Sequence, residues 1–154
     1  MHRWRKFRQL PWPARGYLLE ALLVLPVVKL ALGLLNFRRC QFVLSRLVPR
    51  RVISAGEAVV LQEKSRLIAR MVRAAGVHGA YHATCLPESL ALWWMLRRRR
   101  VPAELRIGVR KEEQQFEAHA WVELSGAVLN DSDDVHQRFA AFERSVSPIQ
   151  AELP

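Results

Sequence analysis

Residues 84–99, TCLPESLALWWMLRRR, carry the strongest structural signal in the chain. The segment 90–96 is apolar nearly all round, which is typical of a central helix buried on all sides. Proline is tolerated in a first helical turn, so Pro87 indicates a helix that begins with Thr84 or Cys85 as its N-cap. This helix is expected to run to about the end of the segment.

Shorter helices are predicted before this one. The run Tyr17–Leu35 is apolar, but Glu20 and Lys29 lie within it and Pro26 interrupts its middle. A membrane span needs about 20 residues with few or no charges, so two short buried helices are the expected structure. A further short helix is predicted over Arg38–Leu47.

A longer amphipathic helix is predicted next. Residues 54–57, SAGE, have the spacing of a capping box, which indicates a helix start. Apolar residues then recur at helical spacing as far as Ala75, and Gly76 is expected to follow the helix as its C′ residue. A loop, Gly76–Thr84, would lead into the helix of Cys85.

The pattern changes to strands after residue 100. In residues 104–110 the odd-numbered positions are apolar and positions 104, 106 and 110 are charged, and a second alternating run covers 118–124. The polar segment 111–117 is expected to connect them, and a third strand should begin at about Ala127. Two phenylalanines three positions apart suggest a final short helix around 139–142. Helices followed by an antiparallel sheet predict an α+β fold, with the helix of residues 84–99 at its centre.

The net charge of +10 lies entirely in the first third of the chain. Residues 1–51 contain eleven Lys and Arg and a single acid, Glu20, whereas residues 52–154 contain thirteen basic and thirteen acidic residues. We therefore expect a basic, apolar, helical region (1–51) that packs on a site-bearing domain (52–154). The basic region predicts an acidic partner, either an anionic membrane surface or an acidic peptide, or else a solubilising tail. Nucleic acid is not expected, because no recognised nucleic-acid motif follows the basic and aromatic stretch 3–8.

The cysteine content indicates a reducing compartment. The chain has two cysteines, Cys40 and Cys85, and no secretory signal is recognised, so a cytoplasmic protein without a disulfide scaffold is expected. A peripheral contact with the inner face of the membrane stays open, because Arg and Lys flank the apolar run on both sides.

Cys85 is the candidate nucleophile. The positive end of a helix dipole favours the thiolate, which is the nucleophilic form of cysteine. The backbone N–H of Cys85, at the same helix end, is a candidate donor to an oxyanion. The alternative is a small structural cysteine, which is common for a free thiol.

His119 is the candidate general base. In the run 118–124 the even-numbered residues are apolar and share one face, so His119 should point away from the main core. A structural histidine is the alternative.

Asp131 is the candidate residue that orients His119. A two-residue turn at 125–126 would place Asp131 on the wrong side of the sheet. A three-residue loop at 124–126 would set the two side chains opposite each other, and the position of Gly126 favours this register. Asp131 would then hold the imidazole tautomer and stabilise its charged form.

A zinc site is a weaker alternative. His78, His82, Cys85 and His119 are plausible zinc ligands, but their spacing matches no usual structural zinc motif. Neither a metal nor a cofactor is therefore expected.

Seven short motifs together resemble one known family. They are TCL at 84–86, SLAL at 89–92, LRRR at 96–99, VPA at 101–103, RIGVR at 106–110, AHAWVE at 118–123 and ND at 130–131. Over roughly residues 52–140 the chain resembles the transglutaminase-like leader peptidases of lasso-peptide biosynthesis, which are papain-like cysteine proteases. It departs from the family pattern at Arg100, where the helix usually ends in glycine, and at Glu88, where a basic residue is expected.

The resemblance implies a function and partners. Cys85, His119 and Asp131 match the family's nucleophile, base and orienting acid, which together cut the leader from a ribosomally made precursor. Residues 1–51 show no winged-helix pattern, so a separate leader-recognition protein is implied, together with an ATP-dependent macrolactam synthetase. The second oxyanion donor is not identified; Tyr81 and His82 are candidates. Two alternatives stay open: a transglutaminase-like acyl transferase and a non-enzymatic, basic, membrane-associated adaptor.

Overall fold

The computed structural model describes residues 10–48, 58–79, 83–112 and 115–142. Its main helices are α2 (Trp12–Leu34), α3 (Phe37–Arg46), α4 (Ala58–His78) and α5 (Cys85–Arg98). They are followed by β1 (Ala103–Glu112), β2 (Gln115–Leu124), β3 (Ala127–Val128), the short helix α6 (Val135–Arg138) and β4 (Ala140–Ala141). The strands form one antiparallel sheet in the order β3-β2-β1-β4, so the predicted α+β class is confirmed.

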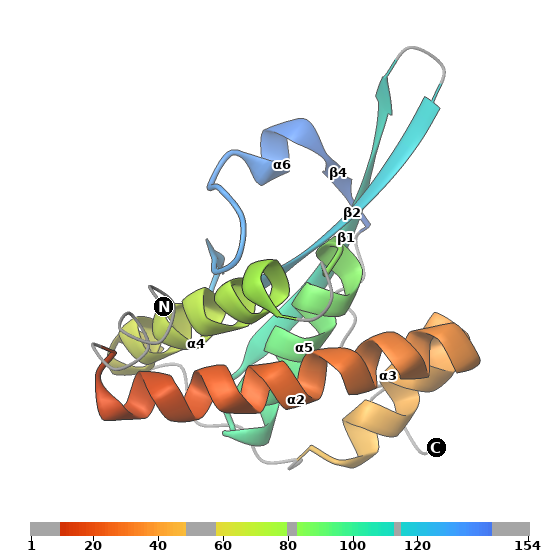
Figure 1. Ribbon diagram of the computed structural model, residues 1–154. Helices are drawn as coiled ribbons and strands as arrows, with labels where there is room; N and C mark the ends of the chain where they lie inside the picture. The colour runs from red at the N-terminus through yellow and green to blue at the C-terminus, as the bar shows by residue number, and fades with distance from the viewer. Residues whose placement is uncertain (1–9, 49–57, 80–82, 113–114, 143–154) are drawn as a thin grey trace, which may run out of the picture.

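Helix α5 is the centre of the fold, as its sequence predicts. It lies between the helices α2 and α4 and the long β1–β2 hairpin (Figure 1). Most side chains between Ser89 and Leu96 are buried, and they form the main core with residues of α2, α4, β1 and β2. The helix ends through Arg100, which takes the left-handed conformation (φ 64°) in which glycine is more usual.

Helix α2 differs from the prediction. Two short buried helices are expected over Tyr17–Leu35, but the structure has one helix of 23 residues with Pro26 inside it. Pro26 lacks the amide that would bond to the carbonyl of Leu22, and the helix continues because both of its halves pack in the main core. Only one side of α2 is buried. Helix α3 agrees with the prediction of a helix over Arg38–Leu47.

Helix α4 runs further than predicted. It passes through Gly76 and ends at His78, so the assignment of Gly76 as the residue after the helix is wrong. Gly76 instead packs closely against the segment before α5: a Cβ there would lie 3.1 Å from the Cβ of Ala83. The predicted capping box at 54–57 lies outside the described residues.

The β1–β2 hairpin is longer than expected. Residues 111–117 are predicted as a connection, but the paired register continues to Glu112 and Gln115. Beyond the core this part of the hairpin is held by cross-strand side chains. Arg110 forms an ion pair with Glu117 at 2.6 Å, and the Lys111 ammonium lies over the ring of Phe116. The hairpin therefore projects past the helices (Figure 1).

The register of β3 also differs from the prediction. Leu124 pairs with Ala127 across a two-residue turn, so the predicted three-residue loop, which pairs Glu123 with Ala127, is wrong. Ser125 (φ 51°) and Gly126 (φ 81°) both have positive φ, as a tight turn that matches the strand twist requires.

The segment after β3 covers the outer face of the sheet. A helix is predicted around 139–142, but the helical turn is α6, and Phe139 and Phe142 flank β4. The residues Trp121, Val128, Val135 and Phe139 form a second, smaller core on this face. The amphipathic pattern is misleading here because burial of Phe139 comes from packing on Trp121 rather than from a helix.

Candidate active site

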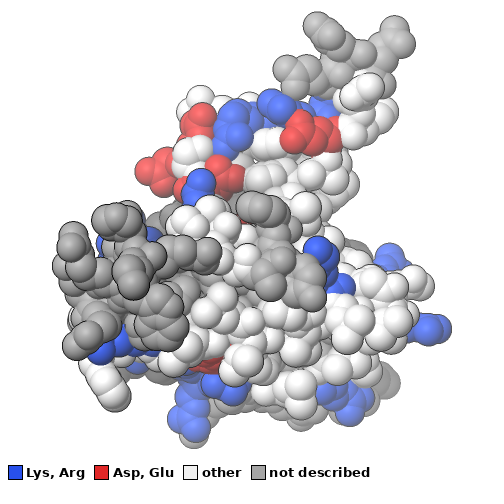
Figure 2. All heavy atoms as spheres, viewed as in Figure 1, with Lys and Arg blue, Asp and Glu red and all other residues white. Residues whose placement is uncertain are grey.

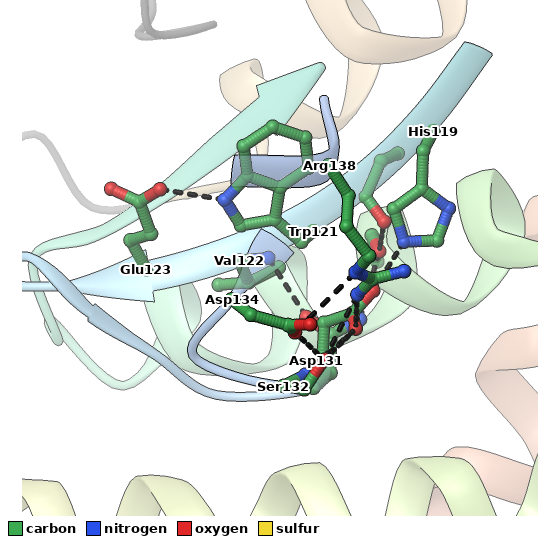
Figure 3. Close-up of polar contacts among 11 residues, drawn as sticks. His119, Trp121, Val122, Glu123, Asp131, Ser132, Asp134 and Arg138 are labelled. Carbon is green, nitrogen blue, oxygen red and sulfur yellow. Dashed lines mark hydrogen bonds and ion pairs between the residues drawn. The ribbon is translucent and has the colours of Figure 1, made fainter. Parts of the chain in front are cut away.

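His119 and Asp131 form a hydrogen-bonded pair. His119 lies in β2, where its ring is on the same face of the sheet as Trp121, and Asp131 follows β3. The Nε2–H of His119 donates to Oδ2 of Asp131 (Figure 3). An imidazole that carries its proton on Nε2 has an acceptor at Nδ1, so Nδ1 is the atom that can take up a further proton.

The Asp131 carboxylate is fixed by further donors. Its Oδ1 accepts hydrogen bonds from the Ser132 amide and from Nη2 of Arg138, both at 2.7 Å (Figure 3). Burial by itself raises the pKa of Asp131, but the hydrogen bonds from His119, Ser132 and Arg138 outweigh it, so its pKa lies below the ordinary value. Asp131 therefore stays ionised at neutral pH.

The His119 ring is held by aromatic packing. It stacks on Phe139 with ring centroids 4.8 Å apart and lies 6.2 Å from the ring of Trp121. Gly108, opposite His119 on β1, makes room for this arrangement, because a Cβ there would lie 2.9 Å from Trp121. The ring plane is thus set by contacts that do not involve Asp131.

Cys85 begins α5, with Thr84 as the N-cap residue, and its side chain is partly exposed. Within the described residues no hydrogen bond joins Cys85 to the His119–Asp131 pair. The first turns of α5 nevertheless lie beside it. Ser89, one turn after Cys85, donates to the carbonyl of Ala120, the residue after His119, at 2.8 Å.

Glu88 adds a second carboxyl group to this region. Burial raises the pKa of Glu88; the charge of Arg73 opposes this rise, and the nearby charge of Asp131 adds to it. Two carboxyl groups at the same end of α5 therefore have pKa values shifted in opposite directions, an arrangement that separates their protonation states.

Asn130 joins the parts of the site. Its Oδ1 accepts from the amide of Val122 at 2.8 Å, and its Nδ2 donates to Oγ of Ser89 at 2.9 Å. The side chain thus takes the place of a backbone carbonyl opposite Val122, and the ladder between β2 and β3 ends at Val128. The chain then leaves the sheet, which is why Asp131 reaches His119 although the predicted register is wrong.

We expect Asn130→Ala to lower the free energy of unfolding by about 1–3 kcal/mol, because the buried amide of Val122 loses its acceptor. Urea denaturation followed by circular dichroism measures this change. The matched control is Asn36→Ala: Asn36 is exposed and makes no side-chain capping bond at the start of α3, so a change within about 0.5 kcal/mol is expected. Equal effects of the two substitutions would show that Asn130 does not hold the strand.

The sequence also suggests donors to an oxyanion and, as a weaker alternative, a metal site. The Cys85 amide lies in the first turn of α5, where N–H groups have no intrahelical acceptor, so it could bind an oxyanion. Tyr81 and His82 lie outside the described residues. Among the residues that the structure describes, no group of three or more His, Cys, Asp and Glu side chains is placed to bind a metal ion.

Several residues of this site are not predicted from the sequence. Ser89 and Asn130 stand in the recognised motifs without an assigned role, and Ser89 is detectable as a polar residue within an apolar helix, four positions after Cys85. Nothing in the local sequence marks Arg138 or Phe139 as site residues, because their contacts with the pair depend on how α6 folds back over the sheet.

The family model of the transglutaminase-like superfamily matches residues 22–144, which is most of the chain. This protein therefore belongs to the transglutaminase-like superfamily, as its motifs suggest. The chain is also similar to the microcin J25-processing protein McjB of Escherichia coli, with 38% identity over 60 residues. The matched region is 39% of this chain and 28% of McjB, so it spans less than a third of the relative's length. No solved structure matches the chain significantly.

Proposed function

We propose that this protein is a cysteine peptidase that removes the leader from a ribosomally made lasso-peptide precursor. The observation that carries the proposal is the His119–Asp131 hydrogen bond beside a helix that begins with Cys85. The similarity to a microcin-processing protein supports a precursor peptide as the substrate.

In the proposed reaction, Sγ of Cys85 attacks the carbonyl carbon at the leader–core junction while Nδ1 of His119 accepts the thiol proton. Asp131 keeps the other proton on Nε2 and stabilises the imidazolium. The Cys85 amide donates a hydrogen bond to the oxyanion. The C–N bond then breaks, and the leaving amine takes its proton from His119. Water hydrolyses the thioester, which frees the leader carboxylate and the thiol.

The proposal includes partners and a compartment. We propose that a separate leader-recognition protein presents the precursor, and that an ATP-dependent macrolactam synthetase closes the ring after cleavage. The basic residues of the segment 1–51 are suited to contacts with such partners or with an anionic membrane face. The proposed location is the cytoplasm, where the thiol stays reduced.

Superfamily membership also favours a second candidate, acyl transfer to an amine, which would use the same three side chains. One experiment separates the two: the purified protein is incubated with a precursor peptide and its recognition protein, with and without an added primary amine, and the products are weighed by mass spectrometry. We expect a leader fragment with a free carboxylate in both reactions. A leader carrying the amine would instead indicate acyl transfer. An intact precursor in both reactions would contradict both activities.

A further inference from the structure

The outward side of α2 carries a continuous row of large apolar side chains. At about 100° per residue, these positions fall within about 80° of the helix circumference. Each is between 53% and 82% exposed. We call this row the outer stripe; its members are Trp12, Leu19, Leu23, Val27, Leu30 and Leu34. A helix on the surface of a soluble protein normally has polar residues on this side, so the outer stripe needs a partner.

The opposite side of α2 is built into the fold. Ala21, Leu25 and Val28 are buried in the main core and pack with α4 and α5. By length and composition alone, α2 could cross a membrane. Its packing on two other helices instead favours a helix that lies along a surface with the outer stripe facing outward.

Lys and Arg side chains lie at the edges of this face (Figure 2). Within residues 10–48 the basic side chains are Arg15, Lys29, Arg38, Arg39 and Arg46. The single acid in that segment, Glu20, is engaged by Arg98 and Arg99 of α5. Figure 2 shows a mainly uncharged surface over α2 with Lys and Arg at its edges.

Helix α3 also has exposed apolar side chains next to basic ones. Phe42 and Val43 are exposed, and Arg39 and Arg46 lie on the same face of the helix at i, i+3, i+4 and i+7 spacing. The Arg46 guanidinium lies 4.8 Å from the centroid of the Phe42 ring.

We propose that the outer stripe of α2 lies on the surface of an anionic lipid bilayer. The apolar side chains would enter the boundary between headgroups and acyl chains, and the cations at the edges of this face would contact lipid phosphates. Trp12, at one end of the stripe, has the amphipathic ring that favours this interface. A second copy of the chain is a poorer partner, because two cationic rims would then face each other. The proposal is independent of the peptidase activity.

Vesicle co-sedimentation of the full chain tests this proposal. We expect binding to vesicles of phosphatidylcholine mixed with phosphatidylglycerol, weaker binding to phosphatidylcholine alone, and release as salt is raised. The double substitution Leu23→Gln and Leu30→Gln should reduce the partition coefficient by at least about tenfold. The substitutions Arg38→Ala and Arg39→Ala should weaken binding to anionic vesicles selectively.

Phe116→Gln is the matched control, since Phe116 is equally exposed but lies on the hairpin. It should bind vesicles like the wild type, and thermal unfolding should show that all variants are folded. Wild-type protein that binds neither vesicle, or a stripe variant that binds as well as the wild type, would overturn the proposal. A wild-type dimer that is lost in the stripe variant, without vesicle binding, would assign the outer stripe to self-association instead.

Discussion

Cys85→Ala is expected to reduce precursor cleavage by at least about 10³-fold, because no other group of the proposed site can form the thioester. Cleavage is measured by mass spectrometry with the precursor and recognition protein present. Cys85 is partly exposed at the start of α5 and contributes little to the core, so the variant should unfold at the same urea concentration as the wild type. Undiminished cleavage by the variant would exclude Cys85 as the nucleophile.

Cys40 provides the internal control for this substitution. It is buried in the main core, and burial raises the pKa of its thiol. Cys40→Ala should therefore retain cleavage. In the wild type, iodoacetamide should modify Cys85 well before Cys40, and His119→Ala should slow the labelling of Cys85. Equal labelling of both thiols would favour the non-enzymatic adaptor, in which the cysteine and histidine are structural.

Local patterns in the sequence predict much of the fold. The apolar run after Cys85 predicts the central helix, and alternation predicts the strands and the face on which His119 lies. These features are predictable because a helix buried on all sides has a continuous apolar run, and a strand buried on one face has apolar residues at every second position. Pro26 is a misleading signal, because tertiary packing on α4 and α5 maintains a helix that its local propensity would break.

The His119–Asp131 contact depends on non-local structure. The predicted contact requires a three-residue loop, which the structure does not have. The contact forms because the Asn130 side chain ends the ladder and redirects the chain, and because Arg138 binds Asp131 from α6. The periodicity of apolar residues does not indicate that a side chain replaces a backbone hydrogen-bond partner, or that a helix folds back over the sheet. Neither feature could therefore be predicted from the pattern of residues.

Asp131→Asn is expected to lower the rate of cleavage by about 10²–10⁴-fold while leaving most of the fold intact. An amide can donate to Nε2 and favour the tautomer with its proton on Nδ1, in which His119 cannot accept the thiol proton. Asp133→Asn is the matched control, because Asp133 is an exposed carboxylate two residues away. It should retain activity. Comparable losses in both variants would assign the effect to the charge of the loop rather than to the His119 contact.

The pH dependence of stability provides a second test of Asp131→Asn. Folding lowers the pKa of Asp131, so its ionised form stabilises the native protein at pH values above its ordinary pKa. That contribution is lost as the pH falls through the lowered pKa. In urea denaturation, Asp131→Asn should therefore be less stable than the wild type at neutral pH, and the difference should narrow in acid. Because Asp131 remains ionised well into the acid range, loss of wild-type activity just below neutral pH would have to come from a group other than this carboxylate. A difference in stability that does not change with pH would show that the ionised carboxylate does not stabilise the site.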